Sequence, residues 1–109
     1  MADPHDTATT YTAARLYDGT ATDLIADGAV SVVGESIVYV GPAAGAPAGE
    51  RVELGDATLL PGLIDTHVHL TFSASLNVVA DYLADTDQLR LIRGVENARR
   101  ALLSGVTTV

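Results

Sequence analysis

The chain has 109 residues, of which 48% are hydrophobic, and it carries a formal net charge of −8 without any cysteine. This length suits one small domain or a piece of a larger one. The acidic balance argues against a nucleic-acid partner, because phosphate backbones are bound by clustered cations. The absence of cysteine excludes disulfides, thiolate metal sites and a cysteine nucleophile. The sequence has neither a secretory signal nor an apolar run of roughly 18 residues, so we expect a cytoplasmic protein without a membrane partner.

The first half of the sequence predicts short strands separated by tight turns. Residues 1–10, which include His5, are polar, and we expect them to form a disordered lead-in. Residues 11–57 alternate β-rich runs with turn signals. Gly34-Glu35 fits a two-residue type II′ hairpin, and Asp27-Gly28 is expected to form another turn. Strands at this spacing are typical of part of a small β-sandwich.

The second half, residues 58–109, predicts a strand, a helix and the start of another strand. We expect the first strand over residues 61–70 and the helix from about Asp87 to Ser104, followed by a C-cap at Gly105. Four residues at helical spacing predict its buried face: Leu91, Val95, Ala98 and Leu102. The arginines are expected on the solvated side of the helix.

This order describes a βαβ unit, which implies parallel strands. The sequence stops as the second strand begins. Because two parallel strands cannot cover both of their faces, we expect the chain to be a fragment that requires the remainder of a larger fold.

Three ionisable residues stand at alternate positions of the strand expected over residues 61–70. Alternate side chains share a face, which places Asp65, His67 and His69 together. Two strand rises separate the histidines by about 6.6 Å, and imidazole nitrogens bind zinc at about 2.0–2.1 Å, so both rings can reach one ion. We predict that His67 and His69 are metal ligands rather than ordinary strand histidines. Asp65 is expected to make a structural hydrogen bond or one that orients a histidine, rather than to bind the metal.

The stretch from Pro61 to His69, PGLIDTHVH, resembles the HxH metal motif on the first barrel strand of the amidohydrolase superfamily. Further stretches similar to that superfamily lie before and after the motif, at residues 14–19, 37–42, 57–62 and 104–109. The combination is most similar to the imidazolonepropionase-like and Xaa-Pro-dipeptidase-like (prolidase) branch.

The resemblance implies an α/β fold in which a (β/α)8 TIM barrel is preceded by strands of a composite β-sandwich. It also implies one or two divalent metals, usually zinc, that activate water. The implied reaction is hydrolysis of C–N bonds in amides or Xaa-Pro dipeptides, with a lactam hydrolase or heterocycle deaminase as the alternative. The other ligands and the catalytic acid–base group are expected outside these residues. We therefore expect the isolated chain to be inactive and the complete enzyme, acting on a small molecule or dipeptide, to be a homo-oligomer.

An interpretation of another class is that the chain is a non-catalytic β module or an assembly fragment. A cooperatively folded monomer without bound metal would favour the module. Aggregation that is relieved by a complementing chain would favour the fragment.

Overall fold

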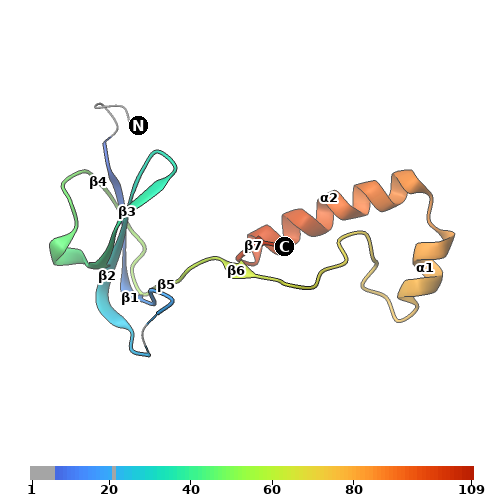
Figure 1. Cartoon of the computed structure of the whole chain (residues 1–109), viewed down its shortest axis with the longest axis horizontal. Helices are drawn as coiled ribbons and strands as arrows, with labels where there is room; N and C mark the ends of the chain where they lie inside the picture. Colours follow the sequence, from blue (N-terminus) through green and yellow to red (C-terminus); the bar gives the residue numbers. More distant parts are fainter. Residues whose placement is uncertain (1–6, 21) are drawn as a thin grey trace. The chain divides into compact units, whose positions relative to one another are not determined.

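The computed structural model describes residues 7–20 and 22–109, and the chain divides into two compact units, Met1–Pro61 and Gly62–Val109 (Figure 1). The division falls later than the boundary expected at residue 57, because strand β5 (Thr58–Leu59) pairs with strand β1 (Thr9–Leu16) in the first unit. Both α and β structure are present, as expected. None of the helices in the described ranges is long and apolar enough to cross a membrane.

The first unit is a five-stranded sheet. Its order is β3-β2-β1-β4, with β5 also paired to β1. The β1–β2 and β2–β3 pairs are antiparallel, whereas β4 and β5 run parallel to β1. A short 3-10 turn, η1, covers Ala43–Gly45. The remaining strands are β1 (Thr9–Leu16), β2 (Ile25–Val33), β3 (Ser36–Pro42) and β4 (Glu50–Glu53).

The expectation of a disordered lead-in over residues 1–10 is wrong at its end. Strand β1 begins at Thr9, and Thr10 is fully buried because it pairs with β2 inside the sheet. Polarity alone predicted a solvated segment, but the hydroxyl has a partner. Residues 1–6, including His5, lie outside the described residues.

The two turn predictions have different outcomes. Gly34 has φ 57° in the two-residue turn between Val33 and Ser36, as the hairpin prediction requires. The turn predicted at Asp27-Gly28 is wrong, because both residues lie within β2. Asp27 instead has φ 46°, a left-handed backbone conformation that aspartate tolerates better than most residues.

The buried side chains of the sheet are small. Leu16 is the largest of them at 2% exposure, and Thr10 and Ser31 are fully buried. Thr10 and Ser31 are directly opposed on β1 and β2, and their hydroxyl oxygens are 2.7 Å apart in a hydrogen bond. The pair satisfies two hydroxyls that would otherwise be buried without partners.

We expect Thr10→Val to lower the free energy of unfolding of the sheet by about 1–3 kcal/mol, because it leaves the Ser31 hydroxyl buried without a partner. The double variant Thr10→Val/Ser31→Ala should lose less than the sum of the single changes. Urea unfolding followed through the amide signals of β1 measures all three. Strictly additive losses would contradict the paired role.

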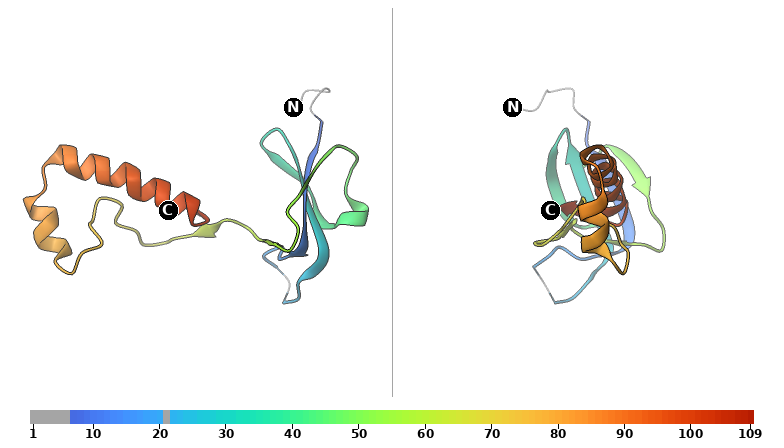
Figure 2. Two further views of the ribbon diagram at one scale, coloured as in Figure 1. Left: turned by 180° about the vertical axis from the view of Figure 1, so that it is seen from behind. Right: turned by 90° about the vertical axis from the view of Figure 1, so that its right-hand side faces the viewer.

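The second unit contains the predicted βαβ connection. Strands β6 (Leu63–Ile64) and β7 (Val106–Thr108) are parallel, and helices α1 (Val78–Ala84) and α2 (Asp87–Leu103) lie between them in sequence (Figure 2). The α2 boundaries agree with the sequence signals. Thr86 Oγ1 accepts a hydrogen bond from the Leu89 amide, and Gly105 has φ 93° just beyond the helix.

The predicted buried face of α2 is wrong. Leu91, Val95 and Leu102 are 61–69% exposed. The half-buried face of α2 instead carries Arg90, Arg93 and Asn97. Helical periodicity identified an apolar stripe correctly, but it does not reveal which face the rest of this unit covers.

Candidate metal centre

The strand that leads to the two histidines is shorter than predicted. Strand β6 ends at Ile64, and the chain bends at Thr66 and His67. The Asp65 carboxylate Oδ1 accepts a hydrogen bond from the His67 amide at 3.0 Å. This local bond competes with strand pairing, as aspartate side chains commonly do. The strand alternation used to place His67 and His69 on one face therefore does not hold beyond Ile64.

The two histidine rings nevertheless meet. Their Nε2 atoms are 3.0 Å apart, and their ring centroids are 4.9 Å apart at an interplanar angle of 67°. Both residues are exposed to solvent. Because a neutral imidazole carries one proton, one Nε2 donates to the other in this arrangement.

This geometry fits two ligands of one ion. Two nitrogens bound to zinc at about 2.0–2.1 Å in tetrahedral geometry lie about 3.3–3.4 Å apart, so only a small opening of the pair is required. With the protons of both rings on Nδ1, both Nε2 atoms would be free to bind the ion. Among the described residues, no cluster of three or more His, Asp or Glu side chains is placed to hold a metal. Within the part of the chain that the structure describes, the geometry therefore offers two neighbouring nitrogens and no third ligand.

Asp65 makes a structural hydrogen bond, which is one of the two kinds expected for it. The Asp65 carboxylate accepts this hydrogen bond from the His67 backbone amide rather than from a histidine ring. It fixes the bend that brings His67 toward His69. Its own amide donates to Thr108 O at 2.9 Å, which anchors the bend to β7.

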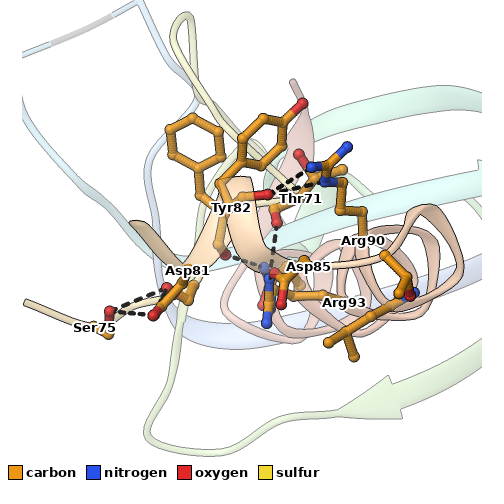
Figure 3. A network of polar contacts seen from close by, with 12 residues as sticks. Thr71, Ser75, Asp81, Tyr82, Asp85, Arg90 and Arg93 are labelled. Atoms are coloured by element: carbon orange, nitrogen blue, oxygen red, sulfur yellow. Dashed lines mark hydrogen bonds and ion pairs between the residues drawn. The ribbon is translucent and has the colours of Figure 1, made fainter. Parts of the chain in front are cut away.

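The His69 ring belongs to a series of ring contacts that includes Phe72 and Tyr82. The His69 ring stacks on Phe72 with centroids 4.5 Å apart and planes 13° from parallel. The ring centroids of Phe72 and Tyr82 are 4.9 Å apart. The Arg90 guanidinium lies 4.3 Å from the Tyr82 ring centroid (Figure 3). A candidate ligand is thereby connected through side chains to helix α2.

The arginines of α2 divide into two groups. Arg99 and Arg100 pair with Glu96 on the exposed side, and their hydrogen bonds lower the pKa of Glu96 to about 2. The prediction of a solvated arginine face is confirmed for these two. It is wrong for Arg90, which donates to Tyr82 O at 2.7 and 3.1 Å, and for Arg93.

Arg93 ties α2 to the C-terminal end of α1. It forms an ion pair with Asp85, and this hydrogen bond raises the pKa of Arg93 (Figure 3). Nearby, the Asp81 carboxylate accepts hydrogen bonds from the Ser75 and Ser73 hydroxyls, which lower the pKa of Asp81. The Asp81 bonds therefore hold the end of the loop between β6 and α1 against α1.

Sequence reasoning missed one residue of this region entirely. Asn97 donates through Nδ2 to Leu70 O at 2.6 Å and to Phe72 O at 3.0 Å. A usable signal existed in the spacing of Arg90, Arg93 and Asn97, which places three polar side chains on one helical face. The Phe72 and Tyr82 rings pack against each other, with their centroids 4.9 Å apart.

No family profile matches the chain, but individual proteins do. The imidazolonepropionase of Arthrobacter sp. is 43% identical over 51 residues, which is 46% of this chain and 13% of that protein. The imidazolonepropionase of Caulobacter vibrioides is 43% identical over 53 residues, again 46% of this chain and 13% of the relative. The matched stretch thus spans a small part of these curated relatives.

Solved structures match over nearly the whole chain. A. niger ochratoxinase has a TM-score of 0.76 at 23% identity, and the match covers 94% of this chain and 24% of the ochratoxinase chain. A Xaa-Pro dipeptidase has a TM-score of 0.72 at 22% identity, covering 93% and 25%. Phenylurea hydrolase B has a TM-score of 0.69 at 28% identity, covering 94% and 24%. The first two likenesses concern the fold alone.

The sequence matches and the structural matches agree with the resemblance carried by the PGLIDTHVH stretch. These matches support a relationship of the chain to the amidohydrolase superfamily.

Proposed function

We propose that this chain forms the first metal-binding segment of a metal-dependent hydrolase that cleaves C–N bonds, with His67 and His69 as two ligands of a divalent cation, most simply Zn²⁺. The observation that carries the proposal is the convergence of the two Nε2 atoms, 3.0 Å apart, on a bend that Asp65 fixes. We further propose that the remaining ligands and the barrel come from sequence outside these 109 residues.

When bound, such an ion supplies Lewis-acid chemistry that makes water a nucleophile near neutral pH and polarises a carbonyl. The residues of this chain contribute orientation. Asp65 holds the His67 backbone, and the Nε2 atoms of His67 and His69, which would hold the ion, lie 3.0 Å apart. Protonated imidazoles cannot bind a cation, so occupancy should fall at acidic pH.

Two substrate classes are candidates. The identity of 43% to imidazolonepropionases favours hydrolysis of a cyclic C–N bond, as in the imidazolone named in those relatives. The dipeptide substrate expected from the sequence has support only at the level of fold, because the Xaa-Pro dipeptidase match is 22% identical. We therefore place the cyclic amide first and the linear dipeptide second.

The test is metal removal from the full-length protein, assayed on one imidazolone-type lactam and one Xaa-Pro dipeptide. We expect a chelator to remove nearly all turnover and Zn²⁺ to restore it, since the ion supplies the Lewis acid. Turnover that persists in metal-free protein, checked by elemental analysis, would overturn the proposal. The relative kcat/KM for the two substrates decides between the classes.

A further inference from the structure

The segment directly after His69 is held by α2 through its backbone. Asn97 Nδ2 donates to Leu70 O at 2.6 Å and to Phe72 O at 3.0 Å, and Arg93 donates to Thr71 O at 3.4 Å. Three consecutive carbonyls are therefore bound by two side chains one helical turn apart. This segment, residues 70–72, is called the carbonyl segment below.

The orientation of the Asn97 amide follows from its neighbours. An amide nitrogen offers two donors, and both contacts here are carbonyl oxygens, which only accept. The opposite assignment would set oxygen against oxygen at both contacts. Both Nδ2 protons are thus used on the carbonyl segment, and Asn97 itself is half-buried.

The carbonyl segment determines where the Phe72 ring lies, and Phe72 is the ring on which His69 stacks. Phe72 also contacts the Tyr82 ring, and the Tyr82 carbonyl accepts a hydrogen bond from Arg90. The position of the His69 imidazole therefore depends on contacts made by one face of α2, at a distance from the ring itself.

We propose that Asn97 is a positioning residue for the metal ligand His69, acting through the carbonyl segment and Phe72. The inference rests on the proposed function, since it treats His69 as a ligand. Residues that orient a metal ligand typically change metal affinity by about 10- to 100-fold when they are replaced. Because Asn97 acts through Phe72, we expect the lower end of that range.

The experiment uses the metal-free full-length protein and Co²⁺ as the probe. Asn97→Ala removes both hydrogen bonds, and Phe72→Leu removes the stacking ring while keeping an apolar side chain. Each should weaken Co²⁺ binding by about tenfold and alter the Co²⁺ absorption spectrum. Because both act on His69 through one path, the double variant should be little weaker than either single variant. Arg99→Ala is the matched control, since Arg99 lies on α2 but pairs with Glu96 on the exposed side.

A second measurement needs no metal. The ring carbon-bound protons of His69 should be shifted upfield in NMR spectra by the parallel Phe72 ring. This shift should disappear in Phe72→Leu and shrink in Asn97→Ala, with His69→Gln used for assignment. The ring shift can also be measured in a variant that no longer binds metal.

Unchanged Co²⁺ affinity and an unchanged His69 shift in Asn97→Ala would overturn the positioning role, as would an equal loss in Arg99→Ala. Failure of the proposed function looks different. In that case Co²⁺ binding would be absent or would survive His69→Ala, whereas the ring shift would still show whether Asn97 holds the carbonyl segment.

Discussion

Replacing His67 or His69 with alanine is expected to lower kcat/KM of the full-length protein by about 10³-fold or more, together with loss of bound metal. Each replacement removes one of the two Nε2 atoms, which lie 3.0 Å apart. Loss of the Lewis acid costs several kcal/mol of transition-state stabilisation, and each 1.36 kcal/mol is a factor of ten in rate. Steady-state kinetics and elemental analysis on the same preparations measure the two effects together.

The control for this pair lies in the same chain. His5 is the one other histidine of the sequence, and His5→Ala changes the same type of side chain outside the PGLIDTHVH stretch. It should leave rate and metal content unchanged. Near-normal turnover with full metal content in His67→Ala or His69→Ala would refute the assignment of these residues as ligands.

The second large effect is expected in the sheet, at Gly28. A Cβ at this position would lie 2.2 Å from Leu16 Cβ and 3.2 Å from Leu16 Cα, and Leu16 is almost fully buried. The clash involves atoms at the root of the side chain, so rotation cannot relieve it. We expect Gly28→Ala to lower the free energy of unfolding of this unit by about 3 kcal/mol, the upper part of the usual range for overpacking.

Urea unfolding of the full chain, followed through amide signals of β1 and β2, measures the loss at Gly28. Ala26→Val is the matched control, because it adds bulk to the same strand at an exposed position. It should change stability little, since β-branched residues suit strands. Equal stability of Gly28→Ala and the unsubstituted chain would show that β1 can move away from β2 without loss.

Much of the fold follows from local signals. The hairpin at Gly34 and both ends of α2 were predictable because they depend on contacts within a few residues, namely a glycine with positive φ and a threonine N-cap. The parallel pairing of β6 and β7 followed from their order around a helix.

The failures have a common physical origin. The end of β6 at Ile64 depends on a carboxylate that bonds its own backbone two residues later, which competes with strand pairing. The half-buried face of α2 depends on carbonyls of a loop more than twenty residues earlier in the chain. Such bonds depend on three-dimensional proximity, which periodicity does not encode. His67 and His69 were therefore brought together as predicted, but by a bend rather than by a strand.

The Thr10–Ser31 hydroxyl pair also bears on how the sheet finds its alignment. A slip of β1 by two residues along β2 would place Thr10 opposite Ala29 or Val33 instead of Ser31. Neither side chain can bond the Thr10 hydroxyl, so this hydroxyl would be buried without a partner at a cost of about 1–3 kcal/mol. A sheet whose buried residues are mostly small has few shape differences to reject such a slip. One polar pair thus gives the central strands a unique register that the small side chains alone would not enforce.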